Sequence, residues 1–197
     1  MPRSSFSRTV PRSTWLEEAC YARNVRRPLP ILLLLAATAC GATANLARVQ
    51  IPLPAGRLPS DVSKMVCSMK VQDEIANVLG VKPVEVTAPT WVNHVYSCRF
   101  MYSNGVMVLS VKELSSAAET SGYFHSLANQ LGNAGHINGL GQGAFSVKNG
   151  SVVVRKDYKV LLVDISELPG QFGSPPTSSA DVANTVADVV LGCWAGD

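Results

Sequence analysis

An alternating run of apolar and polar residues between Trp91 and Leu114 constrains the fold more than any other stretch of this chain. Apolar side chains recur at every second position, at Val92, Tyr96, Cys98, Phe100 and Tyr102, with His94 in the same row. The row resumes at Met107, Leu109 and Val111. Between the two halves lies Ser103-Asn104-Gly105, and Asn and Gly tolerate the positive φ of a tight turn. The stretch therefore predicts a β-hairpin with one buried face.

A second alternating stretch, residues 144–165, predicts a meander of three further strands. Its apolar rows are Phe145 and Val147, then Val152 and Val154, then Leu161, Val163 and Ile165. Asn149-Gly150 and residues 156–159 supply the two turns. The glycine-rich segment Gly139–Gly143 comes just before the first row. Because it leads into a strand and not into a helix, we expect a turn here instead of a phosphate-binding loop.

Three segments carry helical spacing. Residues 61–80 follow the cap residue Ser60 and stop at Gly80, and a kink is expected near Cys67–Met69 because two apolar rows fail to line up. Residues 116–131 open with a capping box, Ser116 to Glu119, in which the Glu side chain returns to the cap N–H. This helix is expected to bury Ala117, Thr120, Phe124, Leu127 and Leu131.

The last helix begins at Ser178, and its inward row is Val182, Val186, Val189 and Cys193. Residues 168–177 before it contain three prolines and two glycines and are expected to form a loop. The fold class is therefore α+β. We expect an antiparallel sheet of about five strands, the hairpin plus the three-strand meander, packed against about three helices in the order α-ββ-α-βββ-α.

A short apolar run, residues 28–40, ends in small residues and Cys40. It has about a dozen residues, whereas a membrane-spanning helix needs roughly twenty. Arg23, Arg26 and Arg27 precede it, which is the layout of an export signal. We therefore expect residues 1–40 to be a signal peptide and Cys40 to become the lipidated first residue of the mature protein. The protein would then sit on the extracytoplasmic face of the cell membrane, held by this lipid anchor.

Other interpretations of this run stay open. Its similarity to a bacterial lipobox is broken at Ala37, where Leu is usual, so ordinary cleavage near Ala39 or Ala42 and an uncleaved anchor are alternatives. The leader before Val25 is long and rich in Arg and Ser, which suggests either an over-extended start or a transit peptide. Residues 41–60 hold three prolines and predict a tether. Residues 61–197 then form a single domain.

Charge argues against a nucleic-acid partner. Six of the 17 basic and two of the 14 acidic residues lie in residues 1–40, so the mature part has 11 basic against 12 acidic residues. It carries no basic patch with interleaved aromatic residues, so binding to nucleic acid is not expected.

Three cysteines remain in the mature part after Cys40, namely Cys67, Cys98 and Cys193. An exported domain lies in an oxidising compartment, so a disulfide is expected. Any two of the three can pair. We favour Cys67 with Cys98, which would tie the first helix to the first strand, over Cys67 with Cys193, which would tie the two terminal helices. No pair has zinc-ligand spacing, and no metal or other cofactor is expected.

A catalytic site would need a nucleophile, a base and an orienting acid in contact. His94, His125 and His136 are the available bases, and Asp157 and Asp164 are candidate acids, but no serine lies in a nucleophile elbow. We therefore expect no enzyme activity and no catalytic residues. A histidine such as His94 among apolar neighbours is more often a hydrogen-bonded core or edge residue than a ligand.

Several segments resemble one protein family. Met65-Val-Cys67, residues 90–98, Gly139-Leu-Gly141 with Ala144-Phe145, and residues 192–197 are similar to a group of actinobacterial cell-envelope lipoproteins. The resemblance covers roughly residues 60–197. It implies a compact antiparallel sheet packed by helices, related to the photosystem P-protein fold, and it carries no activity to transfer.

Two functions follow as expectations. The first is a lipid-anchored, extracytoplasmic binding or interaction module of the bacterial cell envelope without catalysis, whose expected partner is an envelope protein or an apolar ligand. The alternative is a carrier or sensor of an apolar ligand, with a pocket between the sheet and helix 116–131. Its expected lining is Met107, Leu109, Phe124 and Leu127.

Overall fold

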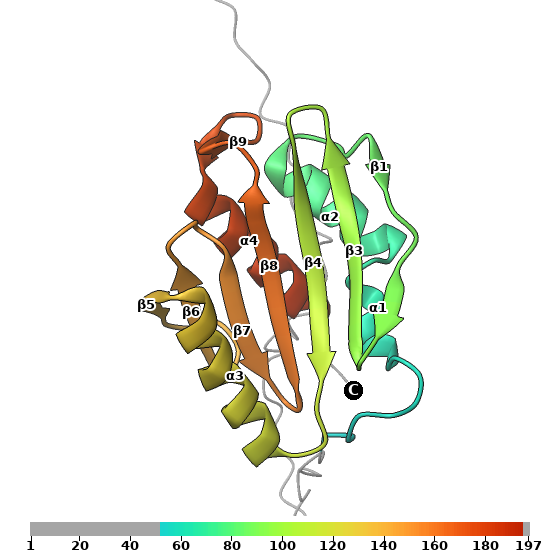
Figure 1. The fold of residues 1–197 in the computed structure, drawn as a ribbon. Coiled ribbons are helices and arrows are strands. Elements are labelled where there is room, and N and C mark those ends of the chain that lie inside the picture. The colour runs from blue at the N-terminus through green and yellow to red at the C-terminus, as the bar shows by residue number, and fades with distance from the viewer. Residues whose placement is uncertain (1–51, 195–197) are drawn as a thin grey trace, which may run out of the picture.

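The computed structural model describes residues 52–194, which form one α+β domain with a mainly antiparallel sheet (Figure 1). Its helices are α1 (Asp61–Met65), α2 (Met69–Leu79), α3 (Ala117–Leu131) and α4 (Ser179–Cys193). Its strands are β1 (Glu85–Val86), β2 (Thr90–Val92), β3 (Val95–Tyr102), β4 (Gly105–Glu113), β5 (Asn133–Ile137), β6 (Gly143–Val147), β7 (Val152–Lys156), β8 (Lys159–Glu167), β9 (Gln171–Phe172) and β10 (Thr177–Ser178).

The main sheet has eight strands in the order β1-β3-β4-β8-β7-β6-β5, with β2 also paired to β3. The expected hairpin is β3–β4 and the expected meander is β6–β7–β8, and both are confirmed. They join through antiparallel pairing of β4 with β8. The expectation of about five strands was too low, because β1, β2 and β5 extend the two edges. A separate two-stranded sheet, β9–β10, occupies part of the expected loop 168–177.

The kink expected in residues 61–80 is a complete break, and it accounts for four helices where three were expected. Ser60 caps α1 by accepting the Ser63 N–H, and Ser68 caps α2 by accepting the Val71 N–H. A side-chain oxygen at the cap satisfies an amide that has no partner within the helix, so each serine starts its own helix. Gly80 ends α2 with a left-handed backbone, φ 64°.

A turn was missed at the start of the predicted hairpin. Asn93 and His94 both have positive φ, 52° and 59°, and reverse the chain between β2 and β3. Residue 92 therefore pairs with Val95, and its side chain is 62% exposed. The expectation that Val92 and His94 belong to the buried row was wrong, whereas Cys98, Phe100 and Tyr102 are buried as expected.

The two faces of the sheet are covered unequally, as Figure 1 shows. Helices α1, α2 and α4 cover one face, and the main core lies between them and the sheet. Helix α3 covers only part of the other face, over β6 and β7 and the near side of β8. Its small core consists of Leu114, Phe145, Val147, Val153 and Val160, with Tyr123, Phe124 and Leu127 packed against it.

Helix α3 is less buried than its spacing predicted. Thr120 is buried, and Phe124 and Leu127 are half-buried, but Ala117 and Leu131 are exposed.

The capping box of α3 is present, but one of its hydrogen bonds has a different partner from the one expected. Ser116 accepts the Glu119 N–H at 3.1 Å, while the Glu119 carboxylate accepts the N–H of Ser115 at 2.8 Å instead of that of Ser116.

The second half of the expected tether is fixed to the domain. The Ala55 N–H donates to the Leu114 carbonyl at 3.1 Å, and the Trp91 indole N–H donates to the Arg57 carbonyl at 3.0 Å. Ser60 donates its N–H and its hydroxyl to Oε1 of the buried Glu113, at 2.8 and 2.7 Å. These contacts move the start of the folded unit from the expected residue 61 to about residue 55.

The expected signal peptide and the lipidation site Cys40 lie outside the described residues. Within residues 52–194, none of the helices combines the length and the apolarity that crossing a bilayer requires.

Candidate interaction surface

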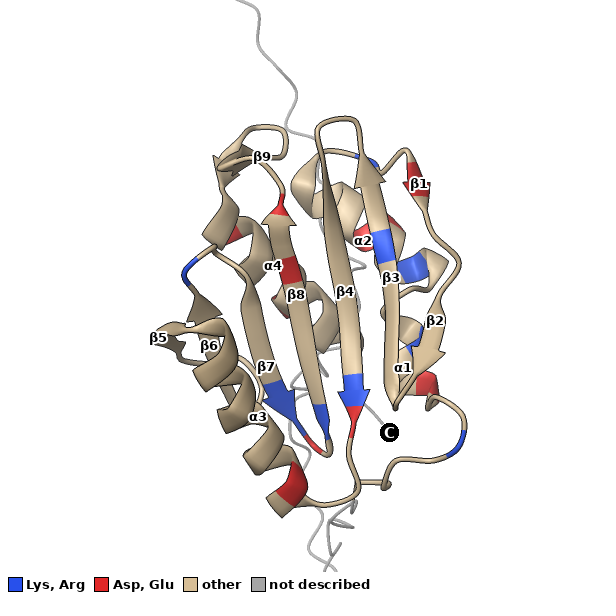
Figure 2. Ribbon diagram, viewed as in Figure 1, with Lys and Arg blue, Asp and Glu red and all other residues tan. Residues whose placement is uncertain are grey.

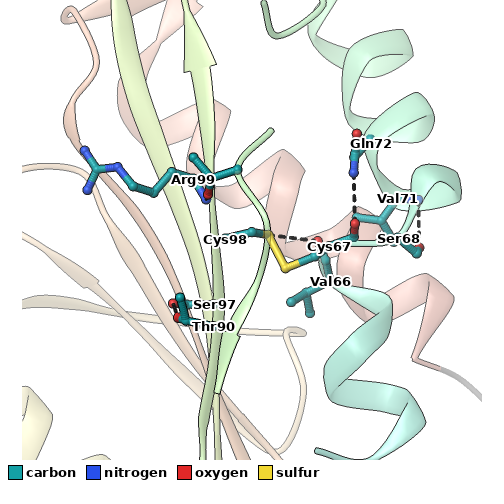
Figure 3. Close-up of a disulfide and its surroundings, with 10 residues drawn as sticks. Val66, Cys67, Ser68, Val71, Gln72, Thr90, Ser97, Cys98 and Arg99 are labelled. Carbon is teal, nitrogen blue, oxygen red and sulfur yellow. Dashed lines mark hydrogen bonds between the residues drawn. A yellow bond between two sulfur atoms is a disulfide. The ribbon is translucent and has the colours of Figure 1, made fainter. Parts of the chain in front are cut away.

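The favoured disulfide is present in the structure and joins Cys67 to Cys98 (Figure 3). Cys67 lies in the break between α1 and α2, and its carbonyl accepts a hydrogen bond from the Gln72 amide at 2.8 Å. Cys98 is buried on the core side of β3, with 6.0 Å between the two Cα atoms. The bond therefore ties the helical layer to the sheet. Cys193, the alternative partner, lies half-buried near the end of α4 and takes no part in it.

On the other side of β3 the sheet carries a surface that none of the helices within residues 52–194 covers (Figure 1). We define the open face as the residues of β2, β3, β4 and β8 whose side chains lie opposite the core side and beside α3. It comprises Thr90, Val92, Val95, Ser97, Arg99, Met101, Val106, Val108, Ser110, Lys112 and Asp164. These residues are half-buried or exposed, in contrast to the buried row on the other face of the same strands.

Hydroxyl groups run across the middle of the open face. Thr90 pairs with Ser97, and their hydroxyl oxygens are 3.1 Å apart. Ser97 in turn pairs with Ser110 on β4, and Ser110 with Leu162 on β8. Cross-strand Thr–Ser pairs stabilise a sheet only modestly. Because the three hydroxyls are not buried, they can also donate to or accept from a bound partner.

Charged residues of both signs lie beyond this row, toward the far end of the sheet from the chain entry at residue 60. Arg99 projects from β3 on the side opposite to the disulfide, as Figure 3 shows. Its guanidinium contacts the carboxylate of Glu167 at 3.2 Å, and both side chains are about half exposed. Asp164 lies two positions along from Leu162 and accepts hydrogen bonds from Ser151 and Ser166. An exposed ion pair adds about 0–1 kcal/mol of stability, so these groups stabilise the fold little.

The border with α3 is formed by a cation and an aromatic ring. The Lys112 ammonium lies 5.8 Å from the centroid of the Tyr123 ring and donates to the Asn93 carbonyl at 2.6 Å. Burial raises the pKa of the Tyr123 phenol above its ordinary value. A second such contact joins β7 to α3, where the Arg155 guanidinium lies 5.6 Å from the centroid of the Phe124 ring. These contacts hold α3 along one margin of the open face and leave the rest of it accessible.

The size and chemistry of the open face suit a macromolecule. Three strands at about 4.8 Å spacing and eight residues at about 3.3 Å give roughly 380 Å² of projected area. A standard interface takes about 800 Å² from each partner, so a partner has to contact the margins as well. Valine and methionine alternate with hydroxyl and charged groups, which is the mixed composition of a non-obligate interface.

The expected apolar pocket is not formed by its four proposed lining residues. Met107 and Leu109 are fully buried in the main core, on the side of α2 and α4. Phe124 and Leu127 pack against the small core on the opposite face of the sheet. The sheet itself separates the two pairs, because neighbouring strand positions point to opposite faces.

The candidate catalytic groups are dispersed. His94, His125 and His136 are all exposed, and His94 stacks edge-on against Trp91 with ring centroids 5.6 Å apart. Asp157 contacts Gln142, and Asp164 contacts Ser151 and Ser166. No cluster of three or more potential metal ligands occurs among residues 52–194. The glycine-rich segment is a turn before β6, where a side chain at Gly141 would collide with the Arg155 carbonyl.

The sequence carries a signal for the open face beside the alternating row that predicts the buried one. Residues 106–109, Val-Met-Val-Leu, are apolar at every position, so a strand there has two apolar faces. Such a strand needs a cover on each side or leaves apolar surface exposed. Asn93-His94 is a second signal, because asparagine is enriched at positive φ and therefore indicates a turn. A turn at this point separates Val92 from the strand that follows and places its side chain on the outer face.

Comparison with known proteins yields no match: neither a family model, nor a curated protein, nor a solved structure matches this chain. The resemblance to actinobacterial envelope lipoproteins therefore stays a prediction.

Proposed function

We propose that this protein is a lipid-anchored, extracytoplasmic interaction module of the bacterial cell envelope that binds an envelope protein and performs no catalysis. The observation that carries the binding role is the open face, since sheet surface of this composition is otherwise covered by a helix or a second sheet. The anchor is supported by the short apolar run that ends at Cys40.

The disulfide supports the compartment. Disulfides persist in secreted and envelope proteins and are rare in the cytosol, where thiols are kept reduced. The Cys67–Cys98 bond packs against the main core beneath β3, as a disulfide that stabilises a fold does. It therefore agrees with an exported domain.

The anchor is tested by mass spectrometry of the purified membrane form. The expected N-terminal peptide begins at Cys40 and carries a thioether-linked diacylglycerol with palmitate-type chains, and a Cys40→Ala variant loses it. A peptide that begins at another residue, or an unmodified Cys40 in a membrane-bound protein, would show that the anchor is wrong.

The binding face is tested by site-specific photo-crosslinking in intact cells. A photoreactive residue at Val108 lies in the centre of the open face, and the matched control at Asn77 lies on the exposed side of α2. We expect one discrete crosslinked protein from position 108 and none from position 77. Equal products from both positions, or products from neither, would refute the open face as the binding surface.

A further inference from the structure

A group of exposed apolar side chains lies at one end of the domain. Leu53 and Leu58 are each 76% exposed, and Val92 is 62% exposed. We call this group, with Arg57 and Lys112, the entry end, because the chain enters the domain there. Large apolar side chains exposed together on a monomer are a mark of an interaction site.

Hydrogen bonds and strand pairing bring the entry end together. The Trp91 indole N–H donates to the Arg57 carbonyl. Leu58 and Val92 directly follow these two residues in the chain, so both lie close to this hydrogen bond. The bond between Ala55 and Leu114 places the chain that follows Leu53 at the end of β4. Val92 pairs with Val95, and Val95 pairs with Lys112, so all five residues lie where β3 begins and β4 ends.

The covalent distance to the proposed anchor limits where this end can be. Pro52 lies twelve residue steps after Cys40. Twelve residues span at most about 40 Å when fully extended. An acylated Cys40 lies in the headgroup region, so the entry end stays within that reach of the bilayer, while the far end of β3 lies a further ~25 Å away along the strand.

We propose that the entry end lies against the bilayer, with Leu53, Leu58 and Val92 inserted at the level of the lipid headgroups. The inference rests on the proposed anchor at Cys40. Trp91 at the centre of this end has the half-apolar, half-polar side chain that prefers the membrane interface. Apolar insertion adds a second attachment to the acyl chains, and two signals hold a protein to a membrane more stably than one.

Electrostatics contributes little to this contact. Arg57 and Lys112 bring positive charge to the entry end, and Figure 2 shows charges of both signs at the end of β4. Asp61 near them is paired with Lys64 at 2.9 Å, and Asp157, Glu119, Lys156 and Lys159 lie at the same end of the sheet. With both signs present, attraction to anionic lipids is weak, and apolar burial carries the contact. The contact therefore depends little on salt.

This placement fixes how the domain presents its open face. The strands β3 and β4 run from the entry end toward Val84, whose N–H donates to the Met101 carbonyl at the other end of β3. With the entry end on the bilayer, the strands lead away from the membrane and the open face points sideways. A neighbouring envelope protein can then reach the part of the open face beyond Val92 and Lys112 without displacing lipid.

The test uses the acylated full-length mature protein in vesicles of phosphatidylcholine with one fifth phosphatidylglycerol. Brominated lipids quench tryptophan only at the membrane, and Trp91 is the reporter, because Trp194 is buried. We expect marked quenching of the wild type, loss of most of it in Leu58→Asp and Val92→Asp, and no change in Val84→Asp. Val84 is the matched control because it is 77% exposed at the opposite end of β3.

Mass spectrometry of Cys40 in the same preparation separates the two proposals. An acylated cysteine without quenching of Trp91, or with quenching that the two entry-end variants leave unchanged, overturns the inference and leaves the anchor intact. An unmodified cysteine overturns the anchor and the inference together. If the entry-end variants change the oligomeric state in detergent but not the quenching, a second copy is the occupant and the lipid contact is refuted.

Discussion

The two faces of the sheet differ in how completely they are covered. On the core side three helices bury a row of large residues in which Phe100, Leu109 and Leu161 have no exposed surface. On the other side α3 covers part of the sheet and leaves the open face to solvent. Burial of apolar area is the main favourable term in folding. The core side therefore contributes most of the stability. The residue types on the open face are less constrained by packing and can serve binding.

The largest effect should come from removing the disulfide on the core side. In a Cys67→Ala/Cys98→Ala variant the chain between positions 67 and 98, a separation of 31 residues, is no longer closed in the unfolded state. A loop of that length corresponds to about 3–4 kcal/mol. We expect the free energy of unfolding to fall by that amount, measured by urea denaturation of the exported domain.

The control for this variant is Cys193→Ala, which changes a half-buried cysteine outside the disulfide and should lower stability by less than about 1.5 kcal/mol. Reduction of the wild type with dithiothreitol should reproduce the double variant. If the double variant is as stable as the wild type, the bond does not fasten α1 and α2 to the sheet.

Adjacent residues on β4 test the difference between the faces directly. Leu109 has no exposed surface and faces the main core, whereas Val108 is half-buried on the open face. Leu109→Ala should lower the free energy of unfolding by about 3 kcal/mol, since truncation leaves a cavity. Val108→Ala should lower it by less than about 1 kcal/mol and should instead weaken crosslinking to the partner. Equal destabilisation would mean that the open face is packed as tightly as the core.

Local patterns predicted those elements that bury an apolar row or carry a cap. The hairpin β3–β4 and the meander follow from the alternation and from the Asn-Gly turns, whereas the two apolar rows of residues 61–80 predicted only a kink where Ser68 in fact caps a second helix. Strands β1 and β5 carry no such row, because Glu85–Val86 is two residues long and Asn133–Ile137 is mostly exposed. They are strands because the edges of β3 and β6 offer unpaired backbone groups to a neighbouring segment.

The open face depends on long-range placement, which local patterns do not contain. Its outward rows follow from the alternation of β3 and β4, but the residues alone do not say which helix lies over them. Helix α3 was expected to bury Ala117 and Leu131, and both are exposed because it lies over β6 and β7. The pairing of β4 with β8 sets that position, and it joins residues more than 40 apart in the chain.

The smallest effect concerns two tyrosines, one on each side of the sheet, at high pH. Burial raises the pKa of Tyr102 on the core side to about 12, and it also raises the pKa of Tyr123 on α3. A phenol whose folded pKa exceeds its unfolded value of 10 stabilises the fold fully below pH 10 and loses that contribution as the pH rises toward 12. For Tyr102 the loss amounts to about 2–3 kcal/mol.

Tyr102→Phe should therefore flatten the fall in the free energy of unfolding between pH 10 and pH 12, measured by urea denaturation at several pH values. At pH 7 this variant should be nearly as stable as the wild type, because the Tyr102 hydroxyl is buried without a hydrogen-bond partner among residues 52–194. Tyr123→Phe is the comparison from the open side and should flatten the curve less, since its ring is only half-buried beside the Lys112 ammonium. If both variants change the curve equally, the two sides of the sheet exclude water to the same degree, and the contrast between a packed face and an open one fails.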